Sequence, residues 1–157
     1  MLWPGLGVLF LDQLLKLLIL KSLQVHQSVA VIQGFFNLVH VRNRGMAFGL
    51  MNRTDMTAFS YVLVGLSMGA VVLLGIWFYH LKPRDRQTIF GLSLILGGAV
   101  GNLTDRLRFR EVIDFLDFYM GSYHWPAFNV ADSAITVGTF WVAVRLLRRQ
   151  PGSDAGT

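Results

Sequence analysis

The chain has 157 residues, of which 54% are hydrophobic and only 15% charged, and its mean hydropathy is +0.51. A soluble domain carries about 25% charged residues, so this chain has too little polar surface to cover itself in water. Its formal net charge is +5, but the basic residues gather at the ends of apolar runs, which fits membrane anchoring and excludes a nucleic-acid-binding stripe.

Four apolar runs along the chain predict four membrane-spanning helices, at about residues 3–20, 58–79, 88–104 and 127–144. The second run has 22 residues without a charge. As a helix it would be roughly 33 Å long, enough to cross a hydrocarbon core of about 30 Å. The first run lacks the basic start and the cleavage site of a signal peptide, so we expect it to be a retained span.

Two basic clusters predict the orientation of these spans. One is the short loop "HLKPRDRQ" after the second run, and the other follows the fourth run; their members are Lys82, Arg84, Arg86, Arg145, Arg148 and Arg149. Two spans separate the clusters, so they lie on the same side, and the positive-inside rule makes that side the cytoplasm, with both termini there. Residues 1–149 are therefore expected to form one membrane domain, followed by a disordered polar tail at 150–157.

The first outer loop, at about residues 24–57, has a strand pattern. "VAVIQGFFNLVHVRNRGMAFGL" (Val29 to Leu50) is rich in β-branched and aromatic residues and is broken at Gly34, which predicts two short strands joined by a turn. The second outer loop contains "REVIDFLDFY", and no strand is predicted in it. The predicted fold is an all-α membrane protein of four transmembrane helices with a small β-sheet in its first extracytoplasmic loop.

Glycine pairs four residues apart occur in two of the predicted helices. They are Gly65 with Gly69 and Gly97 with Gly101. Small residues at this spacing let two helix backbones approach closely in a membrane, so we expect both pairs to be packing sites.

Asp12 and Lys16 lie four residues apart near the middle of the first predicted span. Opposite charges at this spacing share a helix face and can pair. A buried ion pair that fixes helix packing is the favoured interpretation. The alternative is an ion or proton pathway, because ionisable residues inside a membrane are functional candidates by default.

Two further carboxylates are predicted to meet at the outer membrane boundary. Asp132 lies five residues into the fourth run, about 7 Å along the helix from the interface. Asp114 lies 18 residues earlier, in the second outer loop on the same side. Two carboxylates held close at low dielectric share one proton, which is the arrangement of an aspartic protease. The simpler alternative is that each acid caps a helix or lies on the surface.

Metal chemistry has weak support in the sequence. There is no cysteine, and the four histidines are scattered. His124 lies between Asp114 and Asp132, so a mixed carboxylate–histidine site stays open, although no ligand spacing favours it.

Five blocks of the chain carry a resemblance to a known family. They are "LDQLLK" (11–16), "RNRGMAFG" (42–49), "GGAVGNLTDR" (97–106), "EVIDF" (111–115) and "PAFNVADSAI" (126–135). In this order, on four predicted spans, the chain closely resembles the bacterial lipoprotein signal peptidases, also called signal peptidase II, along nearly its whole length.

The resemblance implies an aspartic membrane endopeptidase without a cofactor or metal. Its substrates would be prolipoproteins carrying diacylglycerol on a cysteine, cut just before that cysteine. Asp114 and Asp132 match the family's catalytic aspartates, whereas Asp117 does not, and Asp12 and Lys16 match its first-helix pair. The resemblance also implies a group of residues that support the active site or bind substrate: Asn43, Gly45, Asn102, Asp105, Arg106 and Asn129.

The resemblance further implies a multi-pass protein of the bacterial inner membrane, in contact with lipid, whose active site lies near the outer leaflet and for which a monomer suffices. Two readings compete with it. A small transporter or channel component would use Asp12 and Lys16, and a purely structural subunit would perform no chemistry. Six polar residues near one membrane boundary argue against the second: Asn102, Asp105, Arg106, Asp114, Asn129 and Asp132.

Overall fold

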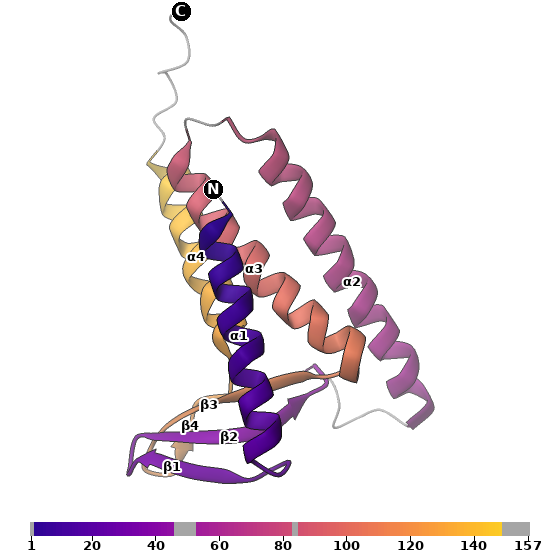
Figure 1. Ribbon diagram of the computed structural model, residues 1–157, viewed down its shortest axis with the longest axis vertical. Coiled ribbons are helices and arrows are strands. Elements are labelled where there is room, and N and C mark those ends of the chain that lie inside the picture. Colours follow the sequence, from indigo (N-terminus) through magenta and orange to yellow (C-terminus); the bar gives the residue numbers. More distant parts are fainter. Residues whose placement is uncertain (1, 46–52, 83–84, 149–157) are drawn as a thin grey trace, which may run out of the picture.

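Four long apolar helices stand on a small antiparallel sheet (Figure 1). The structure is a computed structural model that describes residues 2–45, 53–82 and 85–148. All four helices are long and apolar enough to cross a membrane, so the predicted fold class is confirmed. The expected tail at 150–157 lies outside the described residues, and the single-domain boundary at residue 149 stays a prediction.

The elements in chain order are α1 (Trp3–Ser22), β1 (Ser28–Ile32), β2 (Phe36–Asn43), α2 (Arg53–His80), α3 (Arg86–Phe109), β3 (Val112–Met120), β4 (Tyr123–His124) and α4 (Val130–Leu147).

Helix α3 is the centre of the bundle, and it packs against α1, α2 and α4. Glycines permit the closest approaches. A Cβ atom on Gly97 would collide with the backbone oxygen of Gly5 on α1, and one on Gly138 of α4 would lie 2.6 Å from the backbone oxygen of Gly91. Gly101 faces the Asp12 side chain in the same way, at 2.9 Å. The predicted packing role of Gly97 and Gly101 is therefore confirmed.

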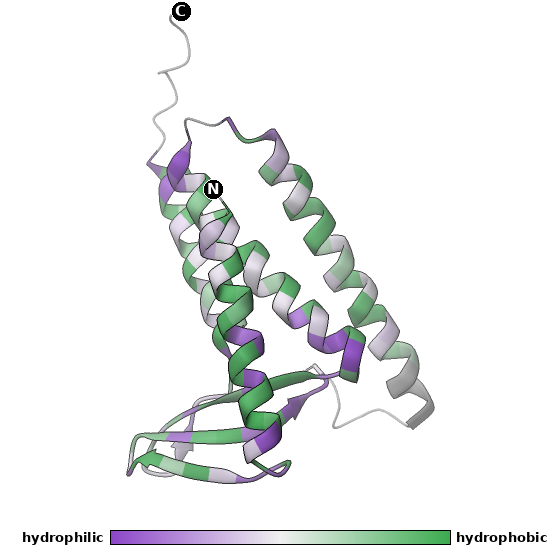
Figure 2. Ribbon diagram, viewed as in Figure 1, coloured by the Kyte–Doolittle hydropathy of each residue, from purple (hydrophilic) through white to green (hydrophobic). Residues whose placement is uncertain are grey.

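The same expectation for Gly65 and Gly69 is wrong. A Cβ atom on either glycine would meet no heavy atom within 4 Å. Both residues lie on α2, which packs mainly against α3 and leans away from α1 toward the sheet end of the bundle (Figure 1). Hydropathy colouring shows α2 to be mostly apolar in this view, and none of its apolar window is buried inside the protein, as expected for a helix that lipid surrounds (Figure 2).

The sheet has the strand order β1-β2-β3-β4, with every neighbouring pair antiparallel. Its first two strands come from the first outer loop, as predicted, and the turn between them contains Gly34 at φ +79°. Strands β3 and β4 come from the second outer loop, in which no strand was predicted. Strand β2 has a bulge between Leu38 and Val41, and directly after this bulge Val41 pairs with Asp114 of β3.

A small apolar cluster joins the sheet to the bundle. Ile19, near the end of α1, packs with Ile113 and Phe115 of β3, and all three side chains are buried. This contact fixes the height of β3 beneath the helices, and so the position of the residue between Ile113 and Phe115, which is Asp114.

The two basic clusters lie at one end of the bundle, as predicted. Arg145, near the end of α4, has its Nε atom 3.8 Å from Oδ1 of Asp85, the residue before α3. The beginning of α1 lies at this end too, and the sheet lies at the other (Figure 1). Arg84 and Arg149 fall outside the described residues.

Candidate active site

Asp114 lies on β3 with only 1% of its surface exposed, and both of its carboxylate oxygens are bonded. Oδ1 accepts a 2.7 Å hydrogen bond from Nδ2 of Asn129, and Oδ2 accepts a 3.0 Å bond from Nδ2 of Asn43. The first donor precedes α4 and the second ends β2, so the carboxylate is held between a helix start and a strand end.

Asp132 lies in the first turn of α4 and is half-buried. Its Oδ1 atom accepts a 2.7 Å hydrogen bond from Nδ2 of Asn102 on α3. Its backbone N–H donates to Oδ1 of Asn129 at 2.8 Å, which makes Asn129 the N-cap of α4.

Asparagines connect the two acids. The amide nitrogen of Asn129 that donates to Asp114 also lies 3.3 Å from Oδ1 of Asn102, whose own amide nitrogen donates to Asp132. Asp114 and Asp132, from a strand and a helix, therefore belong to one buried hydrogen-bond network. The structure brings together the two acids that the sequence singled out.

The surroundings of Asp114 raise its pKa from 3.8 to about 6. Burial is the largest cause, because a desolvated carboxylate is disfavoured relative to the neutral acid. The hydrogen bonds from Asn43 and Asn129 oppose this rise, whereas the charge of Asp132 adds to it. Asp114 thus holds a proton in a pH range where an ordinary aspartate has lost it.

A second buried group supports this network from α1. The Nζ atom of Lys16 lies 2.8 Å from Oδ2 of Asp12, 2.7 Å from Oδ2 of Asp105 and 3.1 Å from Oδ1 of Asn102. Lys16 is 2% exposed and the two aspartates are buried as completely. Burying these charges is tolerable because each is paired and hydrogen-bonded.

The two aspartates of this group also hold backbone near the candidate acids. Oδ1 of Asp12 accepts from the N–H of Ala131, next to Asp132, at 2.9 Å, and Oδ2 of Asp105 accepts from the N–H of Ile113, next to Asp114, at 3.2 Å. These bonds favour the structural interpretation of Asp12 and Lys16 over an ion pathway.

Arg106 lies one turn beyond Asn102 on α3. Its Nη1 atom donates to the backbone oxygen of Asn102 at 3.4 Å. The guanidinium is close enough to interact electrostatically with Asp132, Asp105 and Asp114. It therefore offsets part of the negative charge gathered here.

Gly45 and Arg44 fix the orientation of Asn43. The N–H of Gly45, which has φ +90°, donates to Oδ1 of Asn43 at 2.8 Å, so the amide nitrogen of Asn43 is left to face Asp114. Arg44 then binds Glu111, with Nε 2.6 Å from Oε1. Glu111 is 7% exposed and precedes β3, so this pair ties the end of β2 to the start of β3.

Sequence reasoning did not identify Gln13 and Glu111 as parts of this site. The Nε2 atom of Gln13 donates to Oδ1 of Asp105 at 3.0 Å and lies 3.2 Å from the backbone oxygen of Gly101. An amide within an apolar span was the available signal for Gln13. The sequence carried no such signal for Glu111, because an acid at the edge of a loop is ordinarily solvated.

Asp117 and His124 form a separate cluster. Nδ1 of His124 lies 2.9 Å from Oδ1 of Asp117, whose Oδ2 accepts from Asn37 at 2.8 Å. His124 therefore pairs with Asp117 rather than with Asp114 or Asp132. Within the described part of the chain, no group of three or more His, Asp or Glu side chains is arranged to hold a metal ion.

Residues 5–148 of the chain match the family described as signal peptidase (SPase) II. The chain belongs to the signal peptidase II family. Within this family, a lipoprotein signal peptidase of Desulforapulum autotrophicum is 48% identical over 134 residues, covering 83% of this chain and 81% of that protein. One of Syntrophus aciditrophicus is 44% identical over 148 residues, covering 91% of this chain and 89% of that protein.

Solved structures agree with the family assignment. A structure described as a bacterial membrane enzyme, solved by the in meso method at 1.9 Å, superposes with a TM-score of 0.80 at 28% identity and covers 94% of this chain and 92% of its own. A second such enzyme, at 2.3 Å, has a TM-score of 0.78 at 27% identity and covers 99% and 92%. This signal peptidase II family member is thus a multi-pass membrane peptidase.

Proposed function

We propose that this chain is an aspartic endopeptidase that removes signal peptides from diacylglyceryl-modified prolipoproteins and cuts before the lipidated cysteine. Its membership of the signal peptidase II family and the name lipoprotein signal peptidase carried by its relatives support the substrate class. Asp114 and Asp132 would be the catalytic residues. Asn43, Gly45, Asn102, Asp105, Arg106 and Asn129 would orient them or bind the substrate backbone.

One observation carries the proposal more than any other. A single side chain, Asn129, donates to Asp114 through its nitrogen and caps the backbone of Asp132 through its oxygen. A single buried side chain that orients two acids is the arrangement expected when the two acids act together. Asn129 therefore contacts both acids directly.

In the proposed mechanism the pair carries one proton. The raised pKa of Asp114 favours this residue as the proton's site, with Asp132 ionised. The ionised carboxylate takes a proton from a water molecule, and the water oxygen attacks the carbonyl carbon of the scissile amide. The protonated carboxyl gives its hydrogen to the carbonyl oxygen. Collapse of the tetrahedral intermediate breaks the C–N bond, and a proton from the pair goes to the leaving nitrogen.

The place of the pair in the bundle suits a lipid-anchored substrate. Asp132 begins α4, and Asp114 lies on the sheet at the same end of the bundle (Figure 1). Acyl chains of the substrate could stay in the bilayer while the amide bond reaches the acids near its surface. We propose that this end faces the outer leaflet of the bacterial inner membrane, with both termini cytoplasmic. Since one chain supplies every residue of the network, we propose a monomer.

The decisive experiment is cleavage of a purified diacylglyceryl-modified precursor by Asp114→Asn and Asp132→Asn. Each variant keeps the size of the side chain and removes the ability to carry the charge. We expect cleavage to be lost in both, while membrane insertion is unchanged and both variants still fold. Asp117→Asn is the matched control: it removes an acid from the same strand, and we expect it to leave cleavage within a few-fold of wild type.

Two outcomes would reject the mechanism. One is substantial cleavage by either the Asp114 or the Asp132 variant. The other is loss of cleavage in EDTA that a divalent ion restores, which would assign the acids to metal binding instead.

A further inference from the structure

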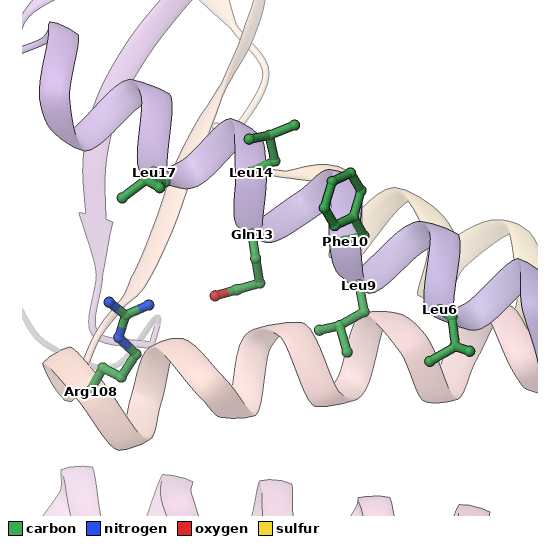
Figure 3. A pocket seen from close by; sticks show the side chains of 7 residues that line it. All are labelled: Leu6, Leu9, Phe10, Gln13, Leu14, Leu17 and Arg108. Atoms are coloured by element: carbon green, nitrogen blue, oxygen red, sulfur yellow. The ribbon is translucent and has the colours of Figure 1, made fainter.

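An apolar groove runs along α1 and reaches the last turn of α3 (Figure 3). It encloses about 550 Å³. The side chains that line it are Leu6, Leu9, Phe10, Gln13, Leu14, Leu17 and Arg108.

The wall of the groove is hydrocarbon over most of its length. Five of its seven lining residues are leucine or phenylalanine on α1, and Phe10 is 70% exposed. From Leu6 to Leu17 the rise along the helix is about 16 Å. Because α1 is a membrane span, this wall meets acyl chains rather than water.

The polar end of the groove carries a cation. Arg108 is exposed in the last turn of α3, at the sheet end of the bundle, and its guanidinium points from α3 toward α1, near Leu17 (Figure 3). Its guanidinium carbon lies 5.0 Å from the ring centre of its neighbour Phe109. Within the described residues, no carboxylate pairs with Arg108, so its charge is available to a ligand.

We propose that this groove binds one anionic phospholipid of the membrane, with the phosphate on Arg108 and an acyl chain along α1 from Leu17 toward Leu6. A planar guanidinium binds phosphate oxygens through two parallel hydrogen bonds. The groove is hydrocarbon along α1 and ends in a cation at the membrane interface. A phospholipid has the same arrangement, with acyl chains in the bilayer and an anionic phosphate at the interface. The partly apolar surroundings strengthen the attraction relative to open water.

The groove is distinct from the peptidase site. Residues two apart on an α-helix project about 200° from one another, so Arg106 and Arg108 lie on nearly opposite sides of α3. Arg106 acts on Asp114 and Asp132, whereas Arg108 lines the groove. Gln13 belongs to both regions, since it lines the groove and donates to Asp105. Bound lipid therefore packs over the junction of α1 and α3.

Native mass spectrometry of the delipidated full chain, titrated with phosphatidylglycerol or phosphatidylcholine, tests this site. We expect wild type to bind one phosphatidylglycerol more tightly than phosphatidylcholine. Arg108→Gln should weaken phosphatidylglycerol binding roughly tenfold, as for the loss of charge-assisted bonds, and abolish the preference. Lys21→Gln is the matched control, because it removes an exposed cation at the same end of the bundle but outside the groove.

A second variant, Leu14→Trp, fills the groove without changing its charge. It should weaken binding of both lipids, and neither variant should alter cleavage of a precursor peptide by more than a few-fold. Equal binding of the two lipids by wild type, or equal losses in the Arg108 and Lys21 variants, would overturn the proposal. A higher KM for lipidated precursor in Leu14→Trp with unchanged phospholipid binding would assign the groove to the substrate and also overturn it. Lipid binding is measured without catalysis, so the result is independent of the proposed peptidase mechanism.

Discussion

The Nδ2 atom of Asn129 lies 2.7 Å from Oδ1 of Asp114, and this bond joins the start of α4 to the middle of the sheet. Asn129 is completely buried, so no water competes for its amide. Since the same side chain caps α4 at Asp132, moving it would displace both acids at once.

Asn129→Ser separates the two tasks of this side chain. The serine hydroxyl can still cap α4, but it is too short to reach Asp114. We expect kcat to fall by about 10²-fold, because a reacting group displaced by an ångström loses that much. Both variants leave Asp114 and the backbone oxygen of Ile113 without this buried donor, so both should unfold at a lower temperature than wild type, and Asn129→Ala should lose a further ~1 kcal/mol with the cap. Serine at this position with wild-type kcat would contradict the orienting role.

The pH profile should report the pKa of Asp114. The pair needs one proton, and burial raises the pKa of Asp114 to about 6, so wild-type kcat/KM should fall as the pH rises through about 6. The hydrogen bond from Asn43 stabilises the ionised form and lowers this pKa. In Asn43→Ala the pKa should therefore be higher, and the falling limb should move to higher pH.

Asn37→Ala is the control for that measurement, because Asn37 lies on the same strand and donates to Asp117 instead. Its falling limb should coincide with that of wild type. A limb that stays in place or moves to lower pH in Asn43→Ala would refute the assignment of this titration to Asp114.

Lys16→Met should destabilise the fold severely. It leaves Asp12 and Asp105 buried without their cation, and breaking a buried ion pair in this way costs about 3–5 kcal/mol. We expect a large fall in the thermal unfolding midpoint in detergent. Lys21→Met, at the exposed end of α1, should have little effect. Partial recovery is expected when Asp12→Asn is added to Lys16→Met, and no recovery would mean that the lysine acts through packing alone.

Gly97→Ala and Gly69→Ala should differ in their effects on stability. The added methyl group collides with Gly5 in the first variant and meets open space in the second. Overpacking of this kind costs about 1–3 kcal/mol, so Gly97→Ala should lower the unfolding midpoint while Gly69→Ala leaves it unchanged or slightly higher. Equal midpoints would show that α1 can move aside.

Span prediction succeeded because hydropathy alone determines which segments enter a bilayer. All four predicted runs lie within or overlap the helices of the structure, although α3 continues to Phe109, five residues past the predicted end. Polar residues from Asp105 onward lower the hydropathy of this end of α3, so the apolar run stops before the helix does. Asp105 pairs with Lys16 of α1, and Arg106 interacts with Asp132 and Asp114 as well as with its neighbour Asp105.

Strand β3 escaped prediction for a physical reason. From Val112 to Phe115 it is buried on both faces, so it lacks the alternation of a half-exposed strand. Asp114 and Asp117, residues depleted in strands, obscured it further. Their tolerance in a strand depends on Asn43, Asn129 and Asn37, which are distant in sequence.

The candidate acids were foreseen from spacing and from resemblance, but their supporting bonds were not. The contact between Asp12 and the backbone of Ala131 joins residues 119 apart in sequence, and nothing local to either residue encodes it. Likewise, the paired glycines of α2 resembled those of α3, and only the placement of α2 at the lipid-facing edge distinguishes them.

The register of β2 against β3 makes strand length matter as much as residue identity. Val41 pairs with Asp114 directly after the bulge at Leu38, and neighbouring residues in a strand point to opposite sides. Deleting or inserting a single residue between Val112 and Asp114 would turn the Asp114 side chain to the wrong side of the sheet, although the aspartate itself is still present. Viable natural variants of this sheet should therefore vary in length at its two turns, around Gly34 and Gly121, and stay invariant in length between the bulge and the helices.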